Sequence, residues 1–242
     1  MGAAVRFFTE AAIGKLMIRV PAIDGHRLWA ESYDQAPNPL LALEARTMRR
    51  ILERAQPKRV IDVACGTGRW LLRLQQSGVS VFGIDACDAM LLQAAKSSSL
   101  SGRLLLGEVG HLPIRDGAAD LVLCSLALGY FHNLERSIDE LARICMPGGQ
   151  IAICDVHPEA LAAGWTRAFT RQGVRYEIDH HIYQWEQIDG AARAAGLHVL
   201  LRESARLAEP ERPFFRKAEK DHLFAAAAAV PALFTGVWER PC

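Results

Sequence analysis

The chain has 242 residues, half of them apolar, which is enough for one hydrophobic core of ordinary size. Lysine and arginine number 28 against 27 aspartate and glutamate, so a formal net charge of +1 gives no broad field to attract nucleic acid or an acidic membrane. We therefore expect one domain with a small-molecule partner, and neither nucleic acid nor a membrane as a partner.

Cysteine spacing and the N-terminal stretch indicate the expected compartment. The six cysteines lack the close paired spacings of a zinc site or a disulfide framework, so we expect no metal. Charged residues between positions 6 and 19 interrupt the N-terminal stretch, which therefore lacks the apolar run of a signal peptide or a membrane anchor. These observations make the cytoplasm the expected location.

Strand and helix patterns alternate through the first two thirds of the chain. Residues 1–56 are a lead-in that closes with a helix, begun by Asn38 and Pro39 and stopped by Pro57. In residues 57–156, segments with the hydrophobic pattern of a strand then alternate with segments that have the pattern of a helix. The expected strands are 59–65, 79–85, 103–106, 120–128 and 150–156, and the helices between them are 69–78, 88–98 and 134–145. A turn is predicted at 147–149. This rhythm is typical of a parallel sheet.

The pattern becomes less regular after His157. Residues 157–183 and 203–231 are expected to be insertions that cover the substrate, with a helix at 184–195 between them. Residues 197–207 and 232–240 predict a late antiparallel hairpin. The expected fold is a single α/β domain over residues 1–242, with a Rossmann-like, doubly wound, mostly parallel sheet, helices on both faces and a C-terminal antiparallel hairpin.

The sharpest motif is VIDVACGTGRW at residues 60–70, a buried strand that leads through small residues directly into a helix. Gly66 and Gly68 let the backbone approach a ligand, and the free N–H groups of the helix start favour an anionic group such as a carboxylate. A dinucleotide-binding loop fails on spacing. The G-x-G-x-x-G pattern places Leu71 or Arg69 where its last glycine belongs.

The segment DVACGTG resembles the D/E-x-G-x-G-x-G signature of class I S-adenosylmethionine-dependent methyltransferases, with Ala64 in place of the first glycine. The resemblance continues in order over about residues 29–156, through GIDACDAML, GEVGHLPIRDGAADLVLCSLALGYFHN and LARICMPGGQIAI. It is strongest to the small-molecule group that includes ubiquinone and menaquinone biosynthesis enzymes. The resemblance implies methyl transfer from S-adenosyl-L-methionine, with S-adenosyl-L-homocysteine as the product.

The resemblance also implies a set of cofactor-binding residues. Asp85 would bind the ribose hydroxyls, and Glu108 and Val109 would flank the adenine. The full set is Tyr33, Asp62, Ala64, Gly66, Gly68, Asp85, Ala86, Met90, Glu108, Val109 and Ser125. Three alternatives stay open. Asp62 could fix the loop by a hydrogen bond, Met90 could be plain core, and Tyr33 could anchor a surface helix.

The catalytic residues are less determined by the sequence. A dry pocket and in-line alignment could supply much of the rate, with a histidine as an optional general base. His132 and His157 follow the fourth and fifth strands and are the candidates, although each could instead be satisfied by a backbone carbonyl or solvent. Dispersed aromatic residues could wall the acceptor pocket, with core packing as the alternative: Trp29, Trp165, Phe169 and Tyr176. Four arginines could recognise an acidic acceptor, with a solvated side chain as the alternative: Arg167, Arg171, Arg175 and Arg216.

Several functions remain open from the sequence. The favoured one is methylation of a small organic molecule on oxygen, nitrogen or carbon. The alternatives are a non-catalytic S-adenosylmethionine-binding sensor or scaffold, an oxidoreductase that uses a dinucleotide, and a methyltransferase with a macromolecular acceptor such as RNA or protein. The net charge near zero argues against RNA as the acceptor. The sequence leaves the acceptor and the oligomeric state undetermined.

Overall fold

A seven-stranded sheet forms the centre of the computed structural model, which describes residues 17–35 and 37–242. Its strands are β2 (Arg59–Val63), β3 (Ser80–Asp85), β4 (Leu104–Leu106), β5 (Ala119–Ser125), β6 (Cys145–Val156), β9 (His198–Ala205) and β10 (Leu233–Glu239). The order is β4-β3-β2-β5-β6-β10-β9, with the first five strands parallel and β10 antiparallel to both of its neighbours. This arrangement confirms the predicted mostly parallel sheet with its C-terminal antiparallel hairpin.

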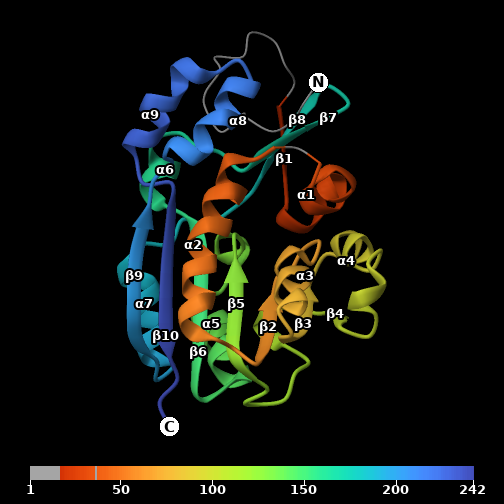
Figure 1. Cartoon of the computed structure of the whole chain (residues 1–242), viewed down its shortest axis with the longest axis vertical. Helices are drawn as coiled ribbons and strands as arrows, with labels where there is room; N and C mark the ends of the chain where they lie inside the picture. The colour runs from red at the N-terminus through yellow and green to blue at the C-terminus, as the bar shows by residue number, and fades with distance from the viewer. Residues whose placement is uncertain (1–16, 36) are drawn as a thin grey trace.

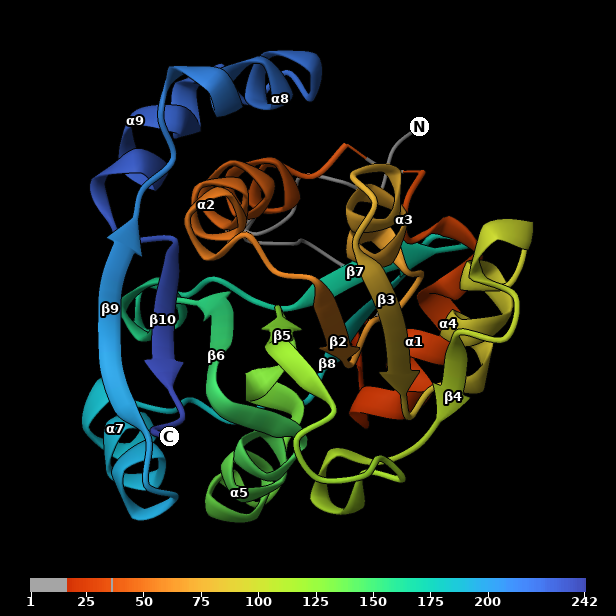
Figure 2. The same ribbon diagram turned by 60° about the horizontal axis from the view of Figure 1, so that its bottom comes forward.

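Helices cover both faces of this sheet (Figure 2). One face carries α2 (Pro39–Ala55) and α3 (Arg69–Gln76), and the other carries α5 (Leu134–Ile144) and α7 (Trp185–Ala194). The predicted start of α2 is confirmed, because the Asn38 side chain accepts a hydrogen bond from the Leu40 N–H at 2.9 Å. The helix ends at Gln56, whose backbone is left-handed with φ 44°. A further helix, α4 (Asp88–Ala94), follows β3.

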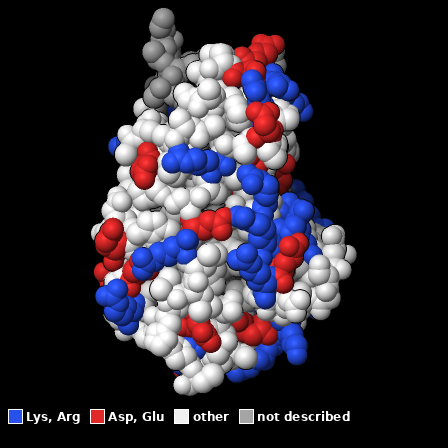
Figure 3. Space-filling view, turned by 60° about the vertical axis from the view of Figure 1, so that its left-hand side comes forward, with Lys and Arg blue, Asp and Glu red and all other residues white. Residues whose placement is uncertain are grey.

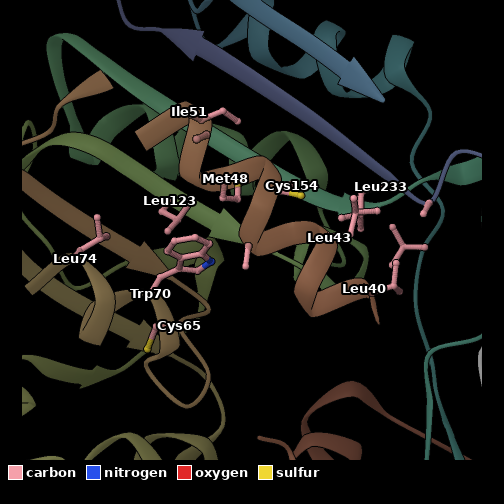
Figure 4. Packing of buried hydrophobic residues seen from close by; sticks show 14 of the residues in the cluster. Leu40, Leu43, Met48, Ile51, Cys65, Trp70, Leu74, Leu123, Cys154 and Leu233 are labelled. Atoms are coloured by element: carbon pink, nitrogen blue, oxygen red, sulfur yellow. The ribbon is translucent and has the colours of Figure 1, made fainter. Parts of the chain in front are cut away.

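Two apolar layers hold the helices to the sheet. Figure 4 shows Met48 of α2 and Trp70 of α3 near Leu123 of β5, in the layer on the α2 side. The layer on the other side joins α5 and α7 to the sheet, and Ile138 and Ile188 are among its fully buried members. Burial of such side chains stabilises the fold by about 1.5–3 kcal/mol for each one.

A smaller sheet and one helix lie over the carboxyl ends of the parallel strands (Figure 1). They are β1 (Met17–Val20), α1 (Ala22–Trp29), β7 (Ala168–Arg171) and β8 (Val174–Ile178), and we call them the cap. In the cap, β8 pairs in parallel with β1 and antiparallel with β7. The lead-in therefore shares a sheet with the predicted insertion at 157–183, a pairing that the sequence pattern did not predict. Residues 1–16 of the lead-in lie outside the described residues.

Short helices complete the chain. They are α6 (Pro158–Ala162), α8 (Arg212–Lys217), α9 (Phe224–Ala229) and the 3₁₀-helices Ala30–Ser32, Ser98–Leu100, Val109–His111, Leu128–Tyr130, Glu209–Glu211 and Asp221–Leu223. The segment with α8 and α9 connects β9 to β10 (Figure 1). Basic and acidic side chains are interspersed on the face shown in Figure 3, which accords with a net charge close to zero.

Two predicted boundaries were wrong at the ends of central strands. The strand predicted at 120–128 ends at Ser125, because Leu126 has a left-handed backbone with φ 58° that turns the chain out of the sheet. The turn predicted at 147–149 lies inside β6, which begins at Cys145, directly after α5. The first of these turns matters for the site, since it exposes the carboxyl end of β5.

Candidate functional site

A cavity of about 420 Å³ opens at the carboxyl ends of β2, β3 and β5. The strand order reverses between β2 and β5, and open α/β sheets bind their ligands at such a point. The wall combines the loop after β2, the end of β3, the loop after β4, the turn after β5 and the first turns of α1. The volume lies within the usual range of small-molecule sites, roughly 300–1,000 Å³.

The loop after β2 repeatedly takes the left-handed backbone conformation. The φ angles are 60° at Ala64, 55° at Gly66 and 77° at Gly68, the residue that precedes α3. Glycine adopts this conformation freely, whereas alanine does so at a cost of roughly 1–2 kcal/mol. Ala64 therefore has the left-handed backbone that a glycine would have at this position, and its backbone is strained.

The two glycines of this loop have different surroundings. Gly66 lines the cavity, and a Cβ atom added there would meet no other atom within 4 Å. A Cβ atom on Gly68 would lie 2.8 Å from the Leu100 side chain, so this glycine permits close packing of the loop on the protein and does not line the cavity. Gly66 therefore leaves open a space that a ligand can enter.

Asp85 ends β3 and ties two loops together at the cavity wall. Its Oδ2 accepts a hydrogen bond from the Gly66 N–H at 2.7 Å, and its Oδ1 accepts one from the Cys87 N–H at 2.8 Å. Burial raises the pKa of this carboxyl group, while the backbone N–H groups oppose the shift. Each carboxylate oxygen has a second lone pair, so the two oxygens can still accept hydrogen bonds from two hydroxyl groups.

Asp62 lies within β2, behind the cavity wall. It is 2% exposed and is absent from the residues that line the cavity. Burial raises its pKa well above the usual range, the nearby Arg69 opposes this shift, and the carboxylates of Glu44 and Asp85 reinforce it. Asp62 therefore lies behind the loop, in the field of the part-buried Arg69.

A buried carboxylate on α2, missed in the sequence analysis, holds the floor of the site. Glu44 is fully buried and accepts hydrogen bonds from Arg69 Nη1 at 2.8 Å, from the Trp70 indole N–H and from the Ser125 hydroxyl. Ser125 lines the cavity, so α2 is connected to the cavity wall through one hydrogen bond. The available signal was a glutamate within the apolar stripe of the helix, between Leu43 and Met48.

The remaining predicted cofactor-binding residues also line the cavity. Ala86, Met90, Glu108 and Val109 line it, together with Tyr33 from the segment after α1. Met90 is 2% exposed and also packs against Ala30 and Tyr33. It is therefore both a buried packing residue and a part of the cavity wall. Burial raises the pKa of Tyr33.

The structure separates the two candidate histidines. His132 lines the cavity and is exposed, and its Nδ1 lies 3.1 Å from Nε2 of His181. His157 is outside the cavity and buried. Its Nδ1 accepts the Glu159 N–H at the start of α6 and its Nε2 lies 3.1 Å from the Ser204 hydroxyl. Both ring nitrogens of His157 are therefore engaged in holding α6 to β9.

Three of the aromatic residues expected near the acceptor form the interior of the cap, whereas Trp165 packs in the apolar layer on the α2 side. Phe169 stacks between Trp29 and Tyr176, with ring centroids 5.0 and 5.3 Å apart. None of these three rings lines the cavity, because the stack lies where α1 packs on β7 and β8. Arg167, a candidate for an acidic acceptor, is instead buried in an ion pair with Asp155, with 2.6 Å between Nη2 and Oδ1.

One further histidine on the wall was missed in the sequence analysis. His26 belongs to α1 and lines the cavity beside Tyr130, with the two rings edge to face at 4.7 Å. Its position depends on how the cap folds over the sheet, so periodicity along the chain gave no signal for it.

The chain resembles known proteins most clearly over its parallel strands. Residues 61–153 match the family described as "Methyltransferase domain". The malonyl-[acyl-carrier protein] O-methyltransferase of Pectobacterium atrosepticum is 31% identical over 58% of this chain and 54% of its own length. The demethylmenaquinone methyltransferase of Thermus thermophilus is 35% identical over 44% of this chain and 50% of its own. The chain thus spans about half the length of these curated relatives.

A solved structure extends the likeness of the fold over most of the chain. An S-adenosylmethionine-dependent methyltransferase from Mesorhizobium loti superposes with a TM-score of 0.60 at 19% identity, covering 79% of this chain and 96% of that one. This confirms the predicted Rossmann-like fold. In residues 17–35 and 37–242, no helix has the length and apolar character needed to cross a membrane. The same residues contain no group of three or more potential metal ligands.

Proposed function

We propose, from the premise that residues 61–153 belong to the methyltransferase domain family, that this chain transfers the methyl group of S-adenosyl-L-methionine to a small organic molecule. The observation that carries the proposal is the pairing of Asp85 with the Gly66 N–H at the edge of the cavity. This contact brings a carboxylate suited to two ribose hydroxyls next to a glycine loop suited to a carboxylate-bearing chain.

The donor would lie along the cavity from the loop after β4 to the turn after β5. Glu108, Val109, Ala86 and Met90 are suited to the adenine end, and Asp85 to the ribose. At the methionine end we propose contacts with Tyr33, Ala64, Gly66 and Ser125, with Asp62 and Gly68 supporting the loop from behind. S-Adenosyl-L-homocysteine would be the product, and an in-line approach in a desolvated pocket would supply much of the rate.

The acceptor is proposed to be a small molecule that enters between the cap and the turn after β5. Apolar groups such as Ile23 and Phe131 contribute to this part of the wall. The curated relatives are named for malonyl-[acyl-carrier protein] and for demethylmenaquinone, which differ in size and in the accepting atom. We therefore propose a small organic acceptor and leave methylation on oxygen, nitrogen or carbon open at this level.

Replacing Asp85 with alanine should weaken binding of S-adenosylhomocysteine by about 1.5–3 kcal/mol, or about 10- to 150-fold, because hydrogen bonds to a charged group are lost. Isothermal titration calorimetry measures this change. Asp139→Ala, an exposed carboxylate on α5, serves as the control and should bind like the wild type.

A second titration separates loss of the ribose contact from loosening of the loop, since Asp85 also holds the Gly66 N–H. Wild-type protein should bind the 2′,3′-dideoxy analogue of S-adenosylhomocysteine much more weakly than the parent compound, whereas Asp85→Ala should bind the two alike. A variant that still distinguishes the two ligands as strongly as the wild type would overturn the ribose role.

A further inference from the structure

His26 is held in one tautomer by its own helix. Its Nδ1 lies 2.7 Å from the backbone carbonyl oxygen of Ala22, which can only accept a hydrogen bond. Nδ1 must therefore carry a hydrogen, and in the neutral ring Nε2 is left with the lone pair. Among the described residues, none forms a hydrogen bond with Nε2. The ring lines the cavity, so a fixed proton acceptor is available at its wall.

The wall near His26 provides no positive charge for an anionic acceptor. None of the described residues that line the cavity is lysine or arginine. The guanidinium of Arg167 lies behind Tyr130, 4.8 Å from its ring centroid, and is paired with Asp155. A carboxylate or phosphate at the reacting end would lose its hydration here without a lysine or arginine among the described wall residues to hold it, and the donor's sulfonium would be left as its counter-charge. The wall therefore favours an acceptor whose reacting group is neutral.

From this geometry we propose that His26 is the general base of the reaction, taking a proton at Nε2 from a neutral, weakly acidic O–H or N–H group of the acceptor. The inference rests on the proposed function, and it assigns both a catalytic residue and a class of acceptor. Phenols, enols and acidic amides belong to this class, whereas carboxylates and phosphates do not. The sequence analysis had considered other histidines for this role.

The step balances in atoms and charge. The acceptor's bond to hydrogen breaks as its heteroatom forms a bond to the methyl carbon, and the carbon–sulfur bond of the donor breaks with its electron pair left on sulfur. The proton passes to Nε2. One positive charge disappears from sulfur as another forms on the imidazole, so the net charge of the cavity is unchanged. The imidazolium then returns its proton to water when product leaves.

The surroundings keep His26 neutral before the reaction. Burial lowers its pKa to about 4, with the charge of Arg167 acting in the same direction and the bond to Ala22 opposing it. Tyr130 also contacts the ring. The carboxylates on the elements around α1 are each already paired with an arginine: Asp88 with Arg27, Glu31 with Arg171 and Glu177 with Arg19. At neutral pH the ring is therefore unprotonated, and its Nε2 lone pair is available.

His132 is less suited to this role, although it also lines the cavity. It is exposed, and its Nδ1 lies 3.1 Å from a nitrogen of His181, so the two rings share one hydrogen bond at the surface. Its side chain is exposed, so water competes with an acceptor for hydrogen bonds to the ring.

Nitrogen-15 NMR of histidine-labelled protein, with and without S-adenosylhomocysteine, tests the resting state of His26 directly. The His26 signals should show the neutral Nδ1–H tautomer from pH 5.5 to 8 and be absent in His26→Asn, which assigns them. The asparagine amide can still donate to the Ala22 carbonyl. A ring that is protonated at pH 7, or that carries its hydrogen on Nε2, would overturn the proposal.

Transfer of labelled methyl groups from S-adenosylmethionine to the small-molecule fraction of a cell extract tests the role in turnover. His26→Asn should lower the initial rate of labelling by about 10²- to 10⁴-fold and leave the affinity for S-adenosylhomocysteine unchanged. His198→Asn, the same substitution at an exposed position on β9, should act like the wild type. Unchanged turnover in His26→Asn would refute the role of His26 alone. Wild-type protein that neither binds S-adenosylhomocysteine nor labels any compound would refute the proposed function.

Discussion

Replacing Glu44 with alanine should lower the free energy of unfolding by about 3–5 kcal/mol, the usual cost of removing one partner from a buried ionic contact. The side chain is fully buried and accepts hydrogen bonds from Arg69, Trp70 and Ser125, so its loss leaves a mostly buried guanidinium without its carboxylate. The Trp70 indole N–H would also lose its acceptor. Urea denaturation monitored by tryptophan fluorescence measures the change.

Glu53→Ala gives the matched control, because Glu53 lies on the same helix but is exposed. Its effect should stay within about 0.5 kcal/mol. If Glu44→Ala were no more destabilising than Glu53→Ala, Glu44 would not be the residue that joins α2 to the loop after β2. Because Ser125 donates to Glu44, weaker binding of S-adenosylhomocysteine should accompany the loss of stability.

The second large effect is expected at the buried pair behind the cavity. Asp155→Ala should also cost about 3–5 kcal/mol, since Arg167 is 6% exposed and would keep its charge without a partner. Asp155 accepts the Gly129 N–H at 2.8 Å as well, so the turn after β5 would lose an anchor. Thermal and urea denaturation both report this loss.

A double-mutant cycle separates the pair from its surroundings. Arg167→Leu combined with Asp155→Ala should cost less than the two single changes added together, because the double variant leaves no unpaired buried charge. Arg171→Ala, which breaks an exposed ion pair with Glu31, should change stability by at most about 1 kcal/mol. Strict additivity at positions 155 and 167 would show that the ion pair does not couple them.

The central sheet was predictable because its signals are local. The segment from Arg59 to Val63 is rich in valine and isoleucine, Gly66 and Gly68 follow it, and Asn38 with Pro39 marks the start of a helix. Each of these features depends on neighbours along the chain. Leu126 shows the limit of such reasoning, because a leucine gives no local sign that its backbone will turn left-handed and end a strand.

The cap was not predictable for a different physical reason. Its strands have four or five residues, and β1 pairs with β8 across more than 150 positions, so their pairing depends on contacts distant in sequence. His26 lies on the cavity wall only because α1 packs beneath this sheet. His157 follows a central strand as predicted, but its ring contacts Ser204 and the start of α6. The sequence pattern does not indicate in which direction this side chain points.

Calorimetric titration of the purified protein with S-adenosylmethionine, S-adenosylhomocysteine and NADH tests the central claim most directly. We expect saturable binding of the first two ligands and none of the third, because the loop after β2 offers Gly66 and Asp85 to a ribose and a carboxylate but lacks the glycine spacing for a pyrophosphate. Binding of NADH, or failure to bind S-adenosylmethionine and S-adenosylhomocysteine, would contradict the account.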